Sequence, residues 1–176
     1  MKEEIVVPQD VTFELNGNFV KVVGKEGTVE KEFKSKVINI KKEGNKIILE
    51  TQNNRRKVLA VLNTVKSIIN NMISGVNKKY KYILRGVYSH FPMTLSVKGK
   101  TFVINNYLGE KSPRVVKIPD DVEVTVKGKE VFVVSVDKEK AGIIAGLIEN
   151  SAKVQKKDRR IFQDGVYIIA KGVQDE

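Results

Sequence analysis

The chain has 176 residues, of which 41% are hydrophobic and 30% are charged, as in a folded globular protein rather than a disordered one. It contains no cysteine, which excludes disulfides, thiolate zinc sites and a cysteine nucleophile and fits a reducing cytosol. The N-terminus lacks the apolar segment of a signal peptide, and no apolar run approaches the roughly 18 residues of a membrane span.

The net charge of +11 is distributed unevenly along the chain. Residues 1–53 carry nine charges of each sign, whereas residues 78–118 carry nine cations and one acid. An acidic segment follows over 119–152, and cations are again in excess over 153–176. Clustered positive charge predicts a polyanionic partner and indicates nucleic acid. A membrane surface would also attract it, but no basic amphipathic helix with exposed aromatic residues is present in the sequence.

Strand and turn signals fill the first 50 residues. Apolar and polar residues alternate over 11–15, and an apolar run follows over 19–23. The intervening Asn16-Gly17-Asn18 predicts a hairpin, because Asn-Gly readily adopts the positive φ of tight turns. Further short strands, the last two joined by a turn at Gly44, are expected over 29–33, 37–41 and 47–50.

After Asn53-Asn54, which is interpreted as an N-cap, the apolar period changes to three or four residues. This period predicts a helix that ends near Gly75, followed by a linker over 75–79. The apolar face of that helix consists of Val58, Leu62, Val65, Ile69, Met72 and Val76.

The same order of signals returns in the second half. Gly99 follows Gly17 by 82 residues and Gly128 follows Gly44 by 84, each within a strand–turn–strand pattern. Asp137 is a good N-cap for a second helix, whose Gly142 and Gly146 are expected to permit close packing on a sheet. The alternative is that all sheet-and-helix sequences look alike at this level.

We therefore predict an α+β fold of two tandem duplicated units, each a small antiparallel β-sheet packed against one α-helix. The first unit is expected over 1–77 and the second over 78–176. The segment 80–92 opens the second unit or bridges the two.

No group of residues resembles a catalytic or nucleotide-binding site. His90 has no second histidine or cysteine nearby, so it is interpreted as a structural or RNA-stacking residue. Asp120 and Asp121 are adjacent, which in a strand directs them to opposite faces. Gly-rich phosphate-binding motifs are missing. An enzyme that acts on an anionic substrate is therefore the weaker hypothesis, and no cofactor is expected.

Two segments of the second unit favour RNA. Residues 153–160 hold five cations and one acid, followed by Phe162, an Asp164-Gly165 turn signal and an apolar strand over 166–170. A solvated lysine-rich tail is the alternative. The stretch 104–119 is interpreted as a loop that interleaves amides, an aromatic ring, a glycine and cations, as RNA-binding loops do.

Two motifs resemble a known family. Residues 105–111 (NNYLGEK) and the pattern V-x-x-K-D-x-R-x-F-x-D-G-V-Y over 154–167 look like signatures of the ribosomal protein L-six family of the large subunit. They are most similar to its archaeal and eukaryotic branch, called L-nine in eukaryotes. The resemblance covers essentially the whole chain, and the Gly/Lys-rich C-terminal motif of the bacterial branch is missing.

The resemblance implies a non-enzymatic, cytoplasmic protein of the large ribosomal subunit, without a cofactor, membrane or small-molecule substrate. Its second repeat would bind large-subunit rRNA near the sarcin–ricin loop, and its first would face the factor-binding region, neighbouring proteins and the stalk base. A general RNA-binding or RNA-chaperone protein is the alternative. In this family Asp164 and Gly165 would shape a turn. The implied rRNA contacts are Asn105, Asn106, Tyr107, Lys111, Arg114, Lys153, Lys156, Lys157, Arg159, Arg160 and Phe162, with His90, Lys98 and Lys100 as weaker candidates.

Overall fold

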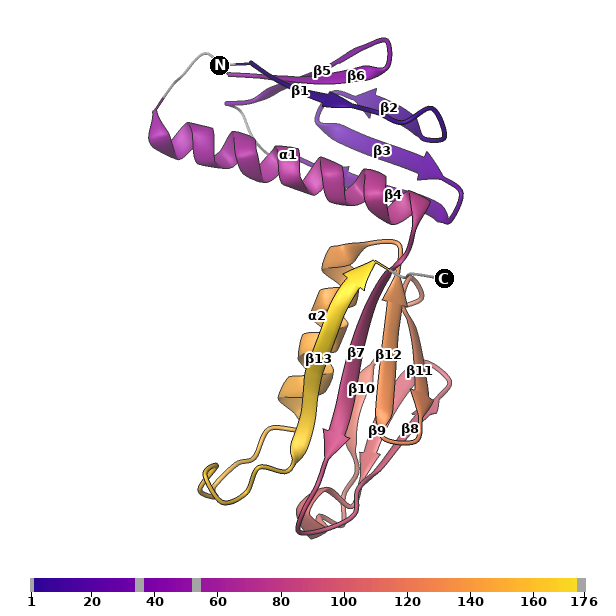
Figure 1. Cartoon of the computed structure of the whole chain (residues 1–176), viewed down its shortest axis with the longest axis vertical. Coiled ribbons are helices and arrows are strands. Elements are labelled where there is room, and N and C mark those ends of the chain that lie inside the picture. Colours follow the sequence, from indigo (N-terminus) through magenta and orange to yellow (C-terminus); the bar gives the residue numbers. More distant parts are fainter. Residues whose placement is uncertain (1, 34–36, 52–54, 174–176) are drawn as a thin grey trace. The chain divides into compact units, whose positions relative to one another are not determined.

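The structure, a computed structural model, describes residues 2–33, 37–51 and 55–173. The chain forms two compact units, Met1–Lys79 and Tyr80–Glu176 (Figure 1). Each unit has its own helix and its own antiparallel sheets.

The first unit contains six strands in two three-stranded antiparallel sheets. One sheet has the order β1-β6-β5 and the other β2-β3-β4. The strands are β1 (Lys2–Val6), β2 (Thr12–Asn16), β3 (Phe19–Gly24), β4 (Gly27–Glu32), β5 (Asn39–Glu43) and β6 (Lys46–Glu50).

Helix α1 (Arg56–Asn77) packs on these strands through the predicted apolar face. Leu62, Ile69 and Val76 are fully buried in it, because their spacing places them on one side of the helix. The helix continues two residues past Gly75, and Arg55 precedes it without a side-chain cap. The predicted Asn53-Asn54 cap lies outside the described residues.

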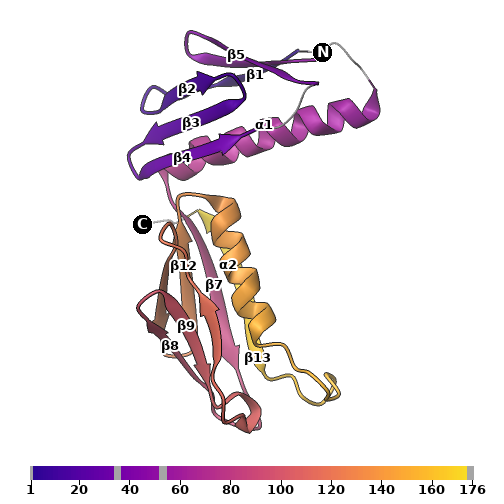
Figure 2. The same ribbon diagram turned by 180° about the vertical axis from the view of Figure 1, so that it is seen from behind.

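The second unit repeats this order and adds one strand. Its sheets have the orders β10-β9-β8 and β11-β12-β7-β13, and helix α2 (Lys138–Ser151) packs on the four-stranded one (Figure 2). As predicted, the Asp137 side chain accepts a hydrogen bond from the Glu139 backbone N–H and caps α2. The strands are β7 (Tyr80–Val87), β8 (Thr94–Lys98), β9 (Thr101–Asn105), β10 (Arg114–Lys117), β11 (Glu123–Lys127), β12 (Glu130–Ser135) and β13 (Gly165–Val173).

The two units share one topology. The order β1-β6-β5 corresponds to β7-β12-β11, and β2-β3-β4 corresponds to the antiparallel sheet of β8, β9 and β10. The four hairpin glycines have positive φ: Gly17 (63°), Gly44 (58°), Gly99 (58°) and Gly128 (62°). The α+β class and the duplication are therefore confirmed, with two sheets in each unit rather than one.

Three expectations need correction. The stretch 104–119 is not a continuous loop, since it contains the short 3₁₀ turn Tyr107–Gly109 and strand β10. Gly165 is the buried first residue of β13 and does not lie in a turn of positive φ. A Cβ on Gly142 would lie 3.1 Å from the Tyr82 hydroxyl, but one on Gly146 would meet nothing within 4 Å, so close packing explains only the first helix glycine.

Candidate nucleic-acid interface

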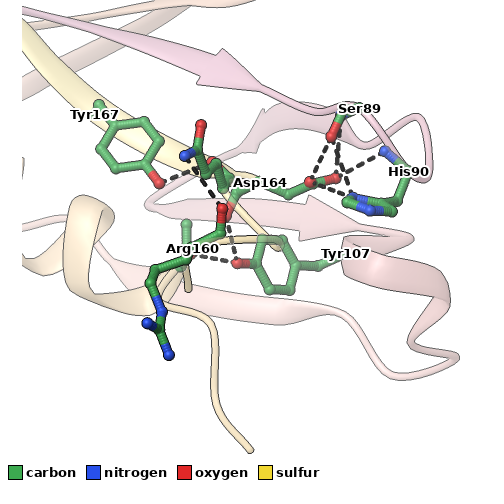
Figure 3. A network of polar contacts seen from close by, with 8 residues as sticks. Ser89, His90, Tyr107, Arg160, Asp164 and Tyr167 are labelled. Carbon is green, nitrogen blue, oxygen red and sulfur yellow. Dashed lines mark hydrogen bonds and ion pairs between the residues drawn. The ribbon is translucent and has the colours of Figure 1, made fainter. Parts of the chain in front are cut away.

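The cationic stretch of residues 153–163, here called the basic loop, connects α2 to β13. Asp164 fixes its far end (Figure 3). The Asp164 carboxylate accepts hydrogen bonds from the backbone N–H groups of Ser89 and His90, both at 3.2 Å. It also accepts from Ser89 Oγ at 3.1 Å and pairs with His90 Nδ1 at 2.8 Å. This side chain therefore holds the loop against the chain that follows β7.

Burial and hydrogen bonds shift the pKa of Asp164 in opposite directions. The residue is only 2% exposed, and this burial alone would raise its pKa. The hydrogen bonds from His90 and Ser89 outweigh burial and lower the pKa from 3.8 to about 2. Asp164 is therefore ionised at neutral pH.

Tyr107 joins the two ends of the basic loop, Ala152 and Asp164, which are here called its neck. Its hydroxyl donates to the carbonyl oxygen of Ala152 at 2.6 Å. The carbonyl oxygen of Asp164, at 2.9 Å, is a second acceptor for the same proton. These two carbonyls flank the basic loop on either side. The ring is 1% exposed, and burial raises the pKa of the phenol to about 12, so it remains a donor at neutral pH.

Arg114 clamps the same neck from strand β10. Its guanidinium binds both carboxylate oxygens of Glu110, at 2.8 and 2.5 Å, and donates to the carbonyls of Ser151 at 2.7 Å and Lys153 at 3.1 Å. The Ser151 carbonyl belongs to the last turn of α2, where a cation is favourable. The guanidinium also lies 4.0 Å from the centroid of the Tyr107 ring.

Tyr107 and Arg114 therefore act inside the protein. The sequence predicted that Tyr107 stacks on a base and that Arg114 binds phosphate. In the structure Tyr107 has no face open to a base, and Arg114, with a side chain 19% exposed, directs its guanidinium to four protein acceptors. These internal contacts hold the two ends of the basic loop together.

Phe162 of the basic loop and His90, which binds Asp164, lie together. Their rings are stacked, with centroids 4.4 Å apart and planes inclined by 24°. Lys157 Nζ lies 4.5 Å from the Phe162 centroid. The stack brings together two predicted contact residues that are 72 positions apart in the chain.

The cations of the basic loop remain exposed. Among the described residues, only Arg160 of this group forms an ion pair, with Asp158 at 3.3 Å, and its side chain is 91% exposed. Asp158 mainly organises the loop backbone, since its carboxylate accepts from the Arg160 N–H and its carbonyl from the N–H groups of Ile161 and Phe162. The exposed cations of the loop are Lys153, Lys156, Lys157, Arg159 and Arg160.

The remaining candidates lie in three places. Asn105 ends β9 opposite Thr94, and Asn106 adopts a left-handed conformation while its side chain donates to the Pro92 carbonyl at 2.9 Å. Lys111 is exposed beyond the 3₁₀ turn. Lys98 and Lys100 belong to the β8–β9 turn, where Lys100 pairs with Asp120, and no hydrogen bond or ion pair between described residues links that turn to the basic loop.

Within the described ranges, no group of three or more histidine and acidic residues could hold a metal ion. No helix in this part of the chain is long and apolar enough to span a bilayer.

Comparison with known proteins agrees with the geometry and the motifs. The family model for ribosomal protein L6 matches residues 7–79 and 91–165, one segment in each unit. The large ribosomal subunit protein uL6 of Staphylothermus marinus is 47% identical over 178 aligned residues, which cover 98% of this chain and 96% of that protein. The uL6 proteins of Saccharolobus solfataricus and Methanococcus vannielii are each 41% identical and cover 98% and 97% of this chain, and 96% and 94% of their own lengths. The chain belongs to the ribosomal protein L6 family, as its two motifs indicated.

Proposed function

We propose that this chain is a structural, non-enzymatic protein of the large ribosomal subunit that binds large-subunit rRNA mainly through the basic loop. Its relatives carry the name of a large-subunit protein. The rRNA region implied by the resemblance lies near the sarcin–ricin loop and the factor-binding site. Neighbouring ribosomal proteins and the stalk base are the proposed partners of the first unit.

One observation carries this proposal: the basic loop is tightly anchored, yet its anchors do not neutralise its cations. The anchoring side chains bind backbone groups at the two ends of the loop. Tyr107 donates to the Ala152 carbonyl and Arg114 to the Ser151 carbonyl, while Asp164 accepts from the Ser89 N–H. Five exposed cations are thereby held close together beyond that neck. Fixed, mutually repelling cations are stabilised by phosphates, and the rigid neck determines where those phosphates lie.

The other candidates extend the same surface. Asn105 ends β9, and Asn106 and Lys111 follow it on either side of the 3₁₀ turn that contains Tyr107. The exposed edge of His90 continues the Phe162 stack. Lys98 and Lys100 would contact phosphates separately from this group.

The test is the salt dependence of rRNA binding. We expect the full chain to prefer deproteinised large-subunit rRNA to unrelated RNA. The variant K156A/K157A/R159A/R160A is expected to bind much more weakly. Its slope of log K against log salt is expected to be smaller by about 3, because each lost phosphate contact removes roughly 0.7 to 0.9.

The matched control removes four exposed cations from the first unit: K2A/K25A/R56A/K57A. Both variants lower the net charge by the same amount, so only the position of the charges differs. Equal loss in both variants would contradict the assignment to the basic loop. Equal binding of all RNAs by the unmodified chain would favour a general RNA-binding protein.

A further inference from the structure

A pocket of about 250 Å³ opens beside the basic loop. It lies between the C-terminal turn of α2, the loop itself and the start of β13. Its volume is far larger than the roughly 30 Å³ share of one water molecule. Besides aliphatic residues, the lining includes aromatic, acidic, amide and cationic side chains: Tyr167, Phe162, Glu149, Asn150, Lys153 and Arg159.

Tyr167 forms an aromatic wall whose position is fixed by two contacts. Its hydroxyl donates to the Gln163 carbonyl oxygen at 2.8 Å. Its ring lies against the backbone of Gly165, where a Cβ would come within 3.1 Å of the ring carbons. The residue is nevertheless 43% exposed. A ring that is already immobilised loses little rotamer freedom when a second ring stacks on it.

Glu149 and Asn150 supply polar groups at the end of α2. Glu149 Oε1 accepts from the Ile168 backbone N–H at 3.0 Å, which orients the carboxylate towards β13. No described residue donates a hydrogen bond to its Oε2, and Asn150 is exposed with no side-chain hydrogen bond to the described chain. The pair therefore offers a carboxylate oxygen and a side-chain amide, which are groups that can hydrogen-bond the edge of a base.

We propose that this pocket binds one unstacked nucleotide of the RNA. Its base stacks on Tyr167, the base edge meets Glu149 and Asn150, and the adjacent phosphate lies between Lys153 and Arg159. The pocket selects guanine, because guanine presents two adjacent N–H donors, which the unoccupied Oε2 of Glu149 and the second lone pair of its Oε1 can accept. This inference rests on the proposed function for the identity of the RNA, but the pocket can be tested without it.

The direct test is an NMR titration of the full chain with each of the four nucleoside 5′-monophosphates. We expect GMP to shift the Asn150 side-chain amide and the Ile168 backbone amide more than AMP, CMP or UMP does. Tyr167→Leu removes the ring and is expected to abolish these shifts, whereas Tyr167→Phe keeps the ring and retains most of them. Glu149→Gln preserves the acceptor for Ile168 and is expected to remove the preference for GMP.

Nucleotide binding in this pocket is contradicted if no nucleotide shifts these two signals, or if the shifts persist in Tyr167→Leu. Thermal unfolding of each variant identifies any that do not fold, and loss of the shifts in a folded Tyr167→Phe would also contradict stacking on the ring. Equal shifts with all four nucleotides would overturn the choice of guanine.

Binding to large-subunit rRNA separates this inference from the proposed function. Tyr167→Leu is expected to weaken binding by about 5- to 150-fold, the range for one base stacked on an aromatic ring, with an unchanged salt slope. Undiminished binding by Tyr167→Leu, beside a reduced slope in K156A/K157A/R159A/R160A, would overturn the pocket and leave the function intact. Failure of the unmodified chain to prefer rRNA would contradict the function, and the nucleotide titration would still decide the pocket.

Discussion

The two units are built on one plan but continue differently after the helix. Each has six strands in the same pairing order followed by one helix. In the second unit the chain then adds the basic loop and β13, which pairs with the outer edge of β7. In the first unit, no described strand pairs with the corresponding edge of β1.

This difference separates the elements shared by both units from the segment that is proposed to bind RNA. The shared strands and helices are held by apolar burial, such as that of Leu62 in α1 and Ile148 in α2. The added segment also buries Val154 and Val166 in the core of the second unit, but the ends of the basic loop are held by polar contacts of Tyr107, Arg114 and Asp164. Duplication thus supplied a stable unit twice, and an added segment carries the proposed function.

The largest expected effect comes from Asp164, which has no counterpart in the first unit. We expect Asp164→Ala to lower the free energy of unfolding of the second unit by about 3 kcal/mol, because four donors on Ser89 and His90 lose their acceptor. Hydrogen exchange of amides in β7 and β6 reports the two units separately. Faster exchange in β6 as well as β7 would contradict this separation. Asp164→Asn keeps one acceptor oxygen and is expected to lose less.

Gly24 provides a test confined to the first unit. A Cβ at this position would lie 2.7 Å from both the carbonyl oxygen and Cγ2 of Val76, so β3 and the end of α1 would have to separate. We expect Gly24→Ala to destabilise the first unit by about 2 kcal/mol. Urea unfolding followed through NMR signals of each unit measures this loss. An unchanged free energy of unfolding of the first unit would show that the end of α1 can move away from β3 without loss of stability.

Acid is expected to weaken the second unit more than the first. The folded-state pKa of Asp164 is lowered from 3.8 to about 2, so its contribution is complete above pH 4 and is lost as the pH falls towards 2. The loss is on the order of 2 kcal/mol. Hydrogen bonds and charge from Lys46 and Lys41 also lower the pKa values of Glu4 and Glu50 in the first unit, but those pairs are exposed to solvent and screened. Unfolding between pH 5 and pH 2.5 measures the difference, and Asp164→Asn is expected to remove it.

Tyr107→Phe tests the neck of the basic loop. The substitution keeps the buried ring and removes the hydroxyl that joins the carbonyls of Ala152 and Asp164. We expect a loss of about 1 kcal/mol in the second unit and faster exchange of amides across the basic loop. Unchanged exchange in the loop would mean that Arg114 alone closes the neck.

The smallest effect is a gain. Gly146 lies inside α2 with open space where a Cβ would be, so Gly146→Ala is expected to stabilise the second unit by up to about 1 kcal/mol. Thermal unfolding measures this change. Gly142→Ala is the matched comparison, because its Cβ would meet the Tyr82 hydroxyl at 3.1 Å, and the gain there is expected to be smaller or reversed. Destabilisation by Gly146→Ala would contradict the open space.

The repeated pattern of the chain was readable because its signals are local. Turn glycines such as Gly17 and Gly99 need only their neighbours to indicate a hairpin, and the apolar period of α1 lies within one helix. Strands with a weak pattern were not predicted as such. The charged β1 and the four-residue β10 are stabilised by pairing with strands elsewhere in each unit.

The site was harder to predict because its contacts are distant in sequence. Tyr107 looks like a stacking residue in a polar stretch, and only its hydrogen bonds to Ala152 and Asp164, 45 and 57 residues away, show that it is internal. Asp164 looked like a turn residue for the same reason. Exposed lysines of the basic loop were predictable, since charge density is itself a local property.

Directed cleavage of rRNA tests most directly the claim that the added segment carries the binding. The chain has no cysteine, so a single introduced cysteine can carry one Fe–EDTA group. Arg160→Cys places it in the basic loop, and Asn18→Cys places it in the β2–β3 turn of the first unit. With each labelled chain bound to large-subunit rRNA, we expect strong cleavage at one cluster of nucleotides from position 160 and little from position 18. Strong cleavage from position 18 with none from position 160 would contradict the account.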